Sequence, residues 1–506
     1  MINMKLKKSL ILAVSALALA GCQEDKFSIE IPFPEAQEEG GETESPVESS
    51  SRDEKYRPQI HYTPAYNWIN DPNGMVYADG VWHLYYQYNP SGNDWGNMSW
   101  GHAVSTDLIH WEEKSVAMRR DNWGDIFSGS AIVDKNNDAG FGAGAILAFY
   151  TGTEPAQQQC LAYSLDGGNT YTQYEGNPVI PNQGIGDFRD PKVFWHQESQ
   201  KWVMCLALGW EHRIEFWGST NLKNWNKLSE FFIDNARVNQ GQFECPDLIR
   251  LPYKGTDKWV LIVSNNPGGV NGGSATEYFV GDFDGTTFTP DPLDYPLWLD
   301  YGADNYAGVT WSNVPDGRTI MIGWMNNWLY CGQVPCSPWR SAMTLPRELS
   351  LVEVNGSPIL ASTVVRELDG IAGDWTDSSN GICSGGSAYE MKFNVDLTKA
   401  SSFTIGNGVE YMEVEINPAA KCMIAKRTAT TGDIYFNTLF SIPSVKAPFN
   451  TDANEMEVHV YVDASSVEIT SADGTMVITN LVFPSSPYDR ISGVNGISYR
   501  ALKSIW

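Results

Sequence analysis

A short, apolar and aromatic strand pattern recurs along the first two thirds of the chain. The five stretches are GVWHLYYQYN from Gly80, AILAFYTG from Ala145, KWVMCLAL from Lys201, KWVLIVSNN from Lys258 and TIMIGWMNN from Thr319, so their starts lie 65, 56, 57 and 61 residues apart. Helical periodicity is scarce, and Gly, Asn, Asp and Pro separate the strands. A four-stranded unit repeated at about this period is typical of a β-propeller, here with five blades.

Each repeat also contains an earlier strand that begins with polar residues. These beginnings are Asn70-Asp71-Pro72, Ser128-Gly129-Ser130, Arg189-Asp190-Pro191, Glu244-Cys245-Pro246-Asp247 and Asp304-Asn305. The innermost strands of a propeller converge on its central channel, so equivalent positions on them converge as well. We therefore expect Asp71, Asp190, Glu244 and Asp304 to face one pocket. Crowded carboxylates are costly unless some are protonated or paired with cations, which makes this cluster a candidate active site rather than four separate turn caps.

The strand pattern changes after about residue 350. Stretches such as YEMKFNVDL and MEVHVYVDASSVEIT alternate apolar and polar residues. This alternation predicts antiparallel strands with one solvated face, and hence a β-sandwich. The expected fold is all-β, with a five-bladed propeller over residues 56–350 and a β-sandwich over residues 351–506. The second domain shows no catalytic constellation.

The N-terminal stretch MINMKLKKSLILAVSALALAGC has the features of an export signal. Lys5, Lys7 and Lys8 precede an apolar run too short to span a bilayer, and the run ends in a small-residue site resembling a bacterial lipobox. We expect residues 1–22 to be a lipoprotein signal peptide with Cys22 lipidated; an ordinary signal peptide is the alternative. Residues 24–54 hold eleven acidic against two basic residues, which predicts a flexible tether over residues 23–55.

This N-terminus predicts a lipid anchor in the bacterial envelope. The acidic stretch QEDK directly after Cys22 resembles the surface-export signals of outer-membrane lipoproteins, so we expect the outer membrane and the cell surface. The formal net charge of −27 argues against a nucleic-acid partner, because phosphate binding needs basic patches. The other seven cysteines show no CxxC pair and the histidines no ligand spacing, so no metal and no cofactor is expected. Cys331 and Cys336 are a possible disulfide.

Eight motifs, in order, resemble glycoside hydrolase family 32, which contains invertases, inulinases and levanases. The three most informative are WINDPNG at residues 68–74, FRDP at 188–191 and ECPD at 244–247. The others are YYQYNP at 85–90, WGNMSWGHAVSTDLIHW at 95–111, FSGSA at 127–131, IGWMNNW at 322–328 and LPREL at 345–349. The resemblance covers residues 56–350 by motif and the rest by position. The family fold is a five-bladed propeller followed by a β-sandwich, which agrees with the repeat count.

The resemblance implies a retaining mechanism on fructofuranosyl bonds, in which two carboxyl groups act across the scissile bond. Asp71 is then the nucleophile, Glu244 the acid/base, and Asp190 the transition-state stabiliser that holds two ring hydroxyls. Nearby Arg189 is expected to support the ionised form of Asp71. The expected substrate-binding residues are Asn70, Gln87, Trp95, Phe127, Ser128, Arg189, Asp304 and Trp324. For Trp95 and Trp324 the alternative is blade packing, and for Asp304 it is a turn.

The expected function is hydrolysis of a fructan polysaccharide or fructo-oligosaccharide. Two alternatives stay open: a fructosyltransferase, which passes the fructosyl unit to a sugar, and a non-catalytic glycan-binding propeller at the cell surface. An anchored enzyme meets polymers first, which favours levan or inulin over sucrose. Asp71-Pro72 argues against an endo-inulinase, since those members often carry Glu-Pro there. The sequence leaves open the choice between levan and inulin, exo and endo cleavage, and the oligomeric state.

Overall fold

The structure is a computed structural model that describes residues 50–233, 241–270, 272–383, 388–427, 436–440 and 444–506. The predicted signal peptide, Cys22 and most of the predicted tether lie outside these ranges. Over the described ranges the chain is almost entirely β, with three short 3-10 helices, η1 (Gly209–Glu211), η2 (Cys331–Gln333) and η3 (Arg366–Ile371). None of the helices in these ranges is long and apolar enough to cross a membrane.

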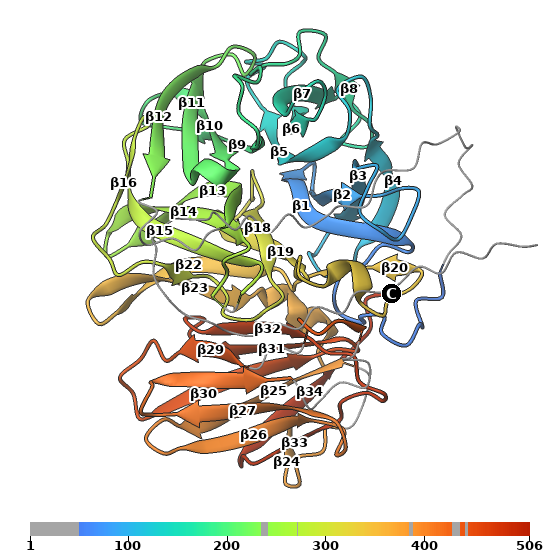
Figure 1. The fold of residues 1–506 in the computed structure, drawn as a ribbon, viewed down its shortest axis with the longest axis vertical. Helices are drawn as coiled ribbons and strands as arrows, with labels where there is room; N and C mark the ends of the chain where they lie inside the picture. Colours follow the sequence, from blue (N-terminus) through green and yellow to red (C-terminus); the bar gives the residue numbers. More distant parts are fainter. Residues whose placement is uncertain (1–49, 234–240, 271, 384–387, 428–435, 441–443) are drawn as a thin grey trace, which may run out of the picture. The chain divides into compact units, whose positions relative to one another are not determined.

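Within the described ranges, five antiparallel sheets follow one another along the chain and form the blades of the propeller (Figure 1). The strands of the first three blades are β1 (Asn67–Ala78), β2 (Val81–Tyr88), β3 (Ser99–Ser105) and β4 (Glu112–Met118); β5 (Ile126–Asp134), β6 (Ala145–Gly152), β7 (Gln158–Ser164) and β8 (Thr172–Gln173); and β9 (Phe188–His196), β10 (Lys201–Leu208), β11 (Arg213–Ser219) and β12 (Asn226–Phe232).

The fourth and fifth blades carry additional short strands. The fourth contains β13 (Gln242–Tyr253), β14 (Thr256–Asn266), β15 (Ala275–Phe283) and β16 (Phe288–Pro290), with β17 (Leu297–Trp298) on β15. The fifth contains β18 (Tyr306–Thr310), β19 (Thr319–Met325), β22 (Arg347–Val354) and β23 (Ser357–Val364), with β21 (Ala342–Met343) on β19. The ring closes where β20 (Trp339–Arg340), which lies between β19 and β21 in the sequence, pairs in parallel with β1 of the first blade.

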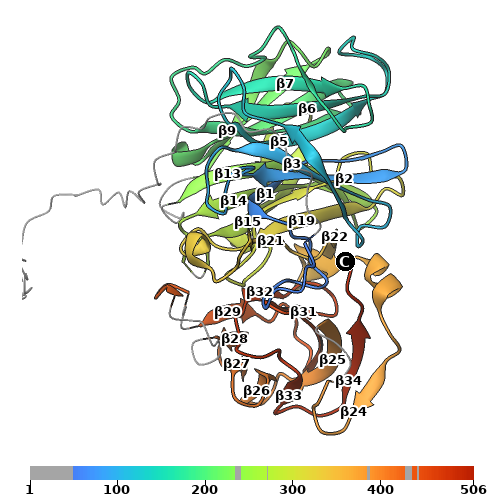
Figure 2. The same ribbon diagram turned by 90° about the vertical axis from the view of Figure 1, so that its right-hand side faces the viewer.

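The remaining strands form two sheets of a sandwich, which Figure 2 shows beside the propeller. One sheet has the order β24 (Thr376–Ser378), β34 (Ile497–Leu502), β25 (Ala388–Asp396), β30 (Glu455–Val462), β31 (Ser466–Ser471) and β32 (Val477–Leu481). The other has the order β29 (Val445–Pro448), β28 (Cys422–Lys426), β27 (Tyr411–Asn417), β26 (Ser401–Gly406) and β33 (Arg490–Ser492). The predicted all-β fold, a five-bladed propeller followed by a sandwich, is confirmed.

Two expected boundaries differ from the structure. The propeller extends past residue 350, because β22 and β23 pair along their whole length as the outer strands of the fifth blade. The expected boundary follows the end of the recurring strand pattern, and these outer strands lie beyond the last recurring stretch. At the other end, Arg52 already pairs with Glu113 at 3.0 Å and donates to the Thr63 carbonyl at 2.7 Å. The last residues assigned to the tether therefore pack on the propeller.

Buried charges link the propeller side of the chain to the sandwich. His61 lies between Asp463 and Glu468, at 2.7 and 2.6 Å, and is 1% exposed. Burial lowers the pKa of His61, but the two carboxylates outweigh it and raise that pKa to about 9. Arg347 of the fifth blade pairs with the same Glu468. Such pairs are costly to break, because removal of one partner leaves a buried charge unpaired.

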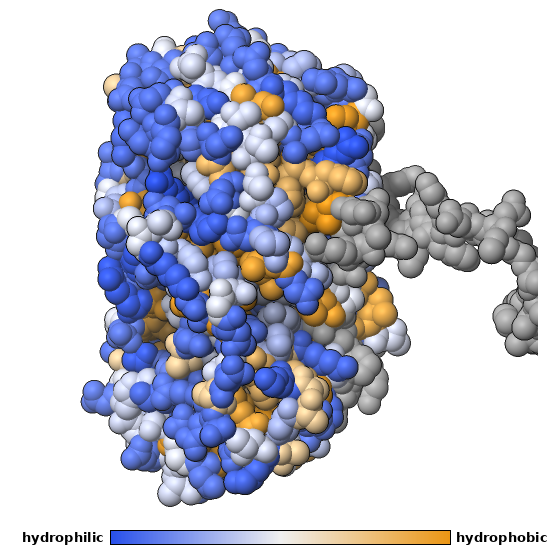
Figure 3. All heavy atoms as spheres, turned by 90° about the vertical axis from the view of Figure 1, so that its left-hand side faces the viewer, coloured by the Kyte–Doolittle hydropathy of each residue, from blue (hydrophilic) through white to orange (hydrophobic). Residues whose placement is uncertain are grey.

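The exterior and the cysteines are unremarkable for a globular protein. Hydrophilic residues cover most of the face in Figure 3, with hydrophobic residues in smaller groups between them.

All seven cysteines of the described ranges are buried and unpaired, so Cys331 and Cys336 form no disulfide.

One irregularity recurs on the innermost strand of every blade. Each of β1, β5, β9 and β13 shifts register against its neighbour at the polar motif found in the sequence, and β18 shifts just after its motif, between Tyr306 and Val309. Asp190, Cys245 and Ala307 have positive φ angles at these points, of 65°, 47° and 53°. A β-bulge turns a side chain away from its regular position on the strand. The five bulges thus redirect polar groups at the same level of the channel.

Candidate active site

Three of the four predicted carboxylates meet at the bulges. Cys245, which follows Glu244 directly, joins the other two: its backbone N–H donates to Asp190 Oδ2 at 2.8 Å, and its Sγ lies 3.5 Å from Asp71 Oδ2. Asp71, Asp190 and Glu244 come from β1, β9 and β13, and 173 residues separate the first from the last. The convergence predicted from the repeat is therefore observed for these three.

Asp71 is held by neutral donors. Ser128 Oγ donates to Oδ2 at 2.8 Å and Asn70 Nδ2 to Oδ1 at 3.1 Å. Asn70 is itself oriented by Trp68, whose Nε1 donates to Asn70 Oδ1 at 2.8 Å. Burial and the charge of Glu244 raise the pKa of Asp71, and the hydrogen bonds from Ser128 and Asn70 oppose this rise. Ser128 and Asn70, both expected at the substrate site, thus fix the carboxyl group of Asp71.

Glu244 has a different set of partners. Arg189 donates to Oε1 from Nη2 at 2.7 Å and from Nε at 3.1 Å, while the Tyr306 hydroxyl donates to Oε2. The expectation that Arg189 supports Asp71 is wrong, because the guanidinium pairs with Glu244 instead. Tyr306 was missed by the sequence reasoning, although it directly follows Asp304-Asn305 at the start of the fifth innermost strand.

Arg189 is fixed by three further acceptors, which lie at the rim of the site. They are Asp187 at 2.5 Å, Gln242 at 2.9 Å and Gln157 at 3.2 Å. Burial lowers the pKa of Arg189, but the charges of Glu244, Asp190 and Asp187 outweigh it and raise that pKa. The guanidinium is therefore a permanent charge that positions Glu244 and offsets part of the carboxylate repulsion.

The pKa of Asp190 is strongly raised. Burial raises it, Arg189 lowers it, and the charges of Glu244 and Asp71 raise it again, giving a value of about 7. Its main chain is held as well, since its N–H donates to Thr151 Oγ1 at 3.0 Å. Asp190 therefore keeps its proton to a higher pH than an ordinary aspartate does.

Three other expected contact residues, Gln87, Trp95 and Phe127, lie in the first two blades. Gln87 is buried on β2 and donates to the Ile126 carbonyl at 3.0 Å. Trp95 and Phe127 are half-buried, with ring centroids 6.2 Å apart, and pack beside Cys245 and Tyr306. Half-exposed aromatic rings at this position provide an apolar surface next to the carboxylates.

Two predicted site residues lie elsewhere. Asp304 is 0% exposed and accepts hydrogen bonds from Arg427 of the second domain at 2.5 Å and from Tyr330 at 2.5 Å. It therefore joins the domains and does not face the channel. Trp324 is also 0% exposed, packed between Trp68 and Trp328. Blade packing is the correct reading of Trp324, and Trp328 of the same motif, which packs on it, is half-buried.

Beyond the carboxylates the channel narrows to a space of about 20 Å³. It is lined by residues that follow the catalytic motifs on the same strands, among them Pro72, Pro191, Lys192 and Pro246. A sugar ring needs far more volume than this. The site is therefore a pocket with a closed floor and not a tunnel.

The chain matches known proteins over nearly its whole described length. The family models "Glycosyl hydrolases family 32 N-terminal domain" and "Glycosyl hydrolases family 32 C terminal" match residues 61–362 and 365–503. A levanase of Bacillus subtilis (strain 168) is 44% identical over 91% of this chain and 72% of its own length. An extracellular exo-inulinase of Aspergillus niger is 39% identical over 86% of this chain and 90% of its own length. The crystal structure of exo-inulinase from Aspergillus awamori superposes with a TM-score of 0.83, at 35% identity, over 90% of this chain and all of the other.

The raised pKa of Asp190 predicts a pH-dependent stability cost. The unfolded chain ionises Asp190 near pKa 3.8 and the folded chain near 7, so the wild type loses stability as the pH rises through this window. Asp190→Asn keeps the shape of the side chain and removes this loss. We expect its melting temperature to exceed that of the wild type by about 2–5 °C near pH ~8 and to match it near pH ~4. Calorimetry across this range measures it, with exposed Asp282→Asn as control; a difference independent of pH would contradict the assignment.

Proposed function

The chain belongs to glycoside hydrolase family 32, and we propose that it is a retaining enzyme that releases fructosyl units from the ends of fructan chains by hydrolysis. The observation that carries this proposal is the unequal surroundings of two carboxyl groups in one pocket. Among the residues that the structure describes, the side chains that donate to Asp71 are all neutral, whereas Glu244 accepts from the Arg189 cation and from Tyr306. Unequal environments are how a site assigns different roles to two carboxyls.

In the first step Asp71 acts as nucleophile. One of its oxygens attacks the anomeric C2 of the fructosyl unit, the bond from C2 to the bridging oxygen breaks, and Glu244 gives that oxygen its proton. The hydrogen bonds from Ser128 and Asn70 to Asp71 fix the attacking carboxylate and limit its side-chain motion. The product is a covalent fructosyl ester of Asp71 and a free leaving hydroxyl.

In the second step Glu244 acts as base. It takes a proton from a water molecule, whose oxygen attacks C2 and releases the Asp71 carboxylate. Arg189 and Tyr306 donate to the two oxygens of Glu244 and hold its carboxyl group in place for this step. Two inversions at C2 give overall retention.

Asp190 is assigned to the hydroxyl groups of the same fructosyl unit. Its carboxyl group is fixed by the Cys245 N–H within the cluster that contains Asp71 and Glu244. Hydrogen bonds from sugar hydroxyls to this carboxylate strengthen as positive charge develops on the ring in the transition state. Gln87, Trp95, Phe127 and Trp328 are the proposed wall of this subsite.

The closed floor of the pocket supports exo cleavage. A fructosyl unit beside Asp71 and Glu244 has no room to continue past Pro72, Pro191 and Pro246, since only about 20 Å³ remains there. This arrangement favours a terminal unit at the carboxylates. The levanase and exo-inulinase relatives support a polymeric fructan as substrate.

A product time course on levan and on inulin tests this function. We expect free fructose from the first time point and no oligosaccharide intermediates. The polymer that is hydrolysed faster identifies the preferred linkage. Early oligosaccharides would contradict exo cleavage, and products longer than the substrate would show transfer to sugar instead of water. Asp71→Asn and Glu244→Gln should fold and lose activity by about 10³-fold or more, whereas Asp282→Asn should not. Near-normal turnover by either of the first two would overturn the assignment.

We also propose that Cys22 carries the lipid that anchors the enzyme to the bacterial envelope, at the outer membrane and facing outward. The basic residues Lys5, Lys7 and Lys8, the apolar run and the LAGC site support this. Cell fractionation measures the membrane association of the protein. The wild type should sediment with the membranes, whereas the Cys22→Ser variant should carry no lipid and should not be retained with them. Equal membrane retention and no lipid mass on the wild type would contradict the proposal. Cys422→Ser is the matched cysteine control.

A further inference from the structure

Trp210 is the most exposed aromatic side chain among the residues that the structure describes, at 57%. It lies in η1, the single turn that connects β10 to β11 in the third blade. Leu208 at the end of β10 pairs with Phe188 at the start of β9, and Arg189 and Asp190 directly follow Phe188. The turn that carries Trp210 therefore lies at the catalytic end of its blade.

This turn packs on the residues that hold Arg189. The Gly209 N–H donates to the Asp187 carbonyl at 2.9 Å, and a Cβ at Gly209 would lie 3.2 Å from the Asp187 Cβ and 3.4 Å from the Gln242 Cβ. The side chains of Asp187 and Gln242 both accept from Arg189, which in turn donates to Glu244. A continuous set of contacts thus leads from the acid/base to η1.

The far end of the turn is fixed as well. The His212 N–H donates to the Gly209 carbonyl at 3.2 Å, and His212 Nε2 contacts the Gly241 carbonyl. The His212 ring packs edge-on against Phe243, with centroids 5.2 Å apart. Because both ends of η1 are held, the backbone under Trp210 is ordered before a ligand arrives, which lowers the entropy cost of binding.

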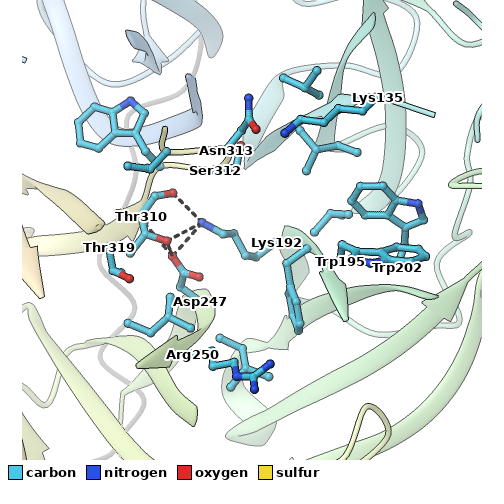
Figure 4. Close-up of a pocket in the computed structure, with 18 of the residues that line it drawn as sticks. Lys135, Lys192, Trp195, Trp202, Asp247, Arg250, Thr310, Ser312, Asn313 and Thr319 are labelled. Atoms are coloured by element: carbon cyan, nitrogen blue, oxygen red, sulfur yellow. Dashed lines mark hydrogen bonds and ion pairs between the residues drawn. The ribbon is translucent and has the colours of Figure 1, made fainter. Parts of the chain in front are cut away.

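The Trp210 ring has no hydrogen bond and no aromatic or cationic partner among the described residues. The other two exposed tryptophans do have partners. Trp195, at the opposite end of the same blade, packs edge-on against Trp202 at 5.2 Å (Figure 4), and Arg500 lies 4.7 Å from the ring of Trp375. Trp210 therefore offers a free apolar ring face and a free N–H donor to a molecule from outside the chain.

Trp210 also lies on the side of the site that the leaving group uses. Glu244 protonates the leaving oxygen, so the leaving part of the substrate lies beside it. The floor below the carboxylates is closed, and the leaving chain continues toward the rim. Arg189 and its acceptors stand between Glu244 and η1. The ring is therefore next to a path of the leaving chain, beyond the unit attached to the leaving oxygen.

We propose that Trp210 stacks on a sugar unit in the leaving part of a fructan chain, beyond the unit attached to the cleaved bond, and so favours long substrates over sucrose. The inference rests on the proposed hydrolysis, because the direction of the leaving chain follows from the role of Glu244. A sugar ring has an apolar C–H face that packs on an aromatic ring and carries no charge, so the acidic side chains nearby do not oppose it.

Kinetics on a polymer and on sucrose test this role. Trp210→Ala should raise KM for the polymer about tenfold and leave kcat near the wild-type value, because the contact is equal in the ground and transition states. The ratio of kcat/KM for the polymer to kcat/KM for sucrose should fall about tenfold. Trp210→Phe, which keeps a ring face, should recover most of this ratio, and Trp195→Ala is the matched control that should not change it.

Two kinetic outcomes would overturn the proposal. An unchanged ratio in Trp210→Ala would show that the ring does not contact the leaving chain. A lower kcat on the polymer and on sucrose alike would show that the turn acts through Arg189 and not by stacking.

A binding measurement separates this inference from the proposed hydrolysis. Levan-type and inulin-type oligosaccharides of five units are titrated into the Asp71→Asn chain labelled with 5-fluorotryptophan, with the Trp210 resonance assigned by Trp210→Phe. We expect at least one of the two sugars to shift this fluorine resonance and to saturate it, while sucrose leaves it in place and the Trp195 resonance does not move. No response to either oligosaccharide would overturn the inference. A wild type that hydrolyses neither polymer would overturn the proposed function, and the Trp210 resonance would still decide whether fructan binds there.

Discussion

The geometry of the site depends on five breaks in strand pairing, one on each innermost strand of the propeller. A regular strand sends successive side chains to alternate faces, and a bulge changes that direction locally. Proline follows the redirected residue in three blades, at Pro72, Pro191 and Pro246, where a ladder hydrogen bond is not needed. In the second blade the residue is Gly129, whose Cβ would lie 1.9 Å from the Phe149 carbonyl oxygen, so no side chain fits. The bulges thus place one redirected residue from each blade around the same channel.

The carboxylates that these bulges bring together repel one another, and the site contains what is needed to hold them. Arg189 places one cation beside Glu244, and Ser128, Asn70 and the Cys245 N–H give hydrogen bonds to the two aspartates. These interactions do not fully offset the repulsion between the carboxylates, since the pKa of Asp190 remains at about 7. Stability lost at such a site is recovered at others, where burial favours the fold. The uneven distribution of charge also distinguishes the surroundings of Asp71 from those of Glu244.

Much of this was predictable from the sequence, because it follows from local pattern. The repeat of strands gave the propeller, and the polar motifs at equal places in the repeat gave Asp71, Asp190 and Glu244. The predictions that failed concern contacts between residues far apart in the sequence, which no local sequence pattern shows. Asp304 occupies the expected place in the repeat, but its carboxylate pairs with Arg427 of the second domain, 123 residues later in the sequence. Arg189 stands next to Asp190 in sequence, yet only the folded blades decide that it reaches Glu244.

The central claim is that Asp71, presented by the bulge of β1, forms a covalent bond to the sugar. Intact-protein mass spectrometry of Glu244→Gln, mixed with a β-fructofuranosyl donor whose leaving group needs no acid, tests it most directly. Without its base, the variant should accumulate a species heavier by one fructosyl unit, and peptide mapping should place that unit on Asp71. Absence of the adduct during turnover of the activated donor, or its location on Asp190, would contradict the account.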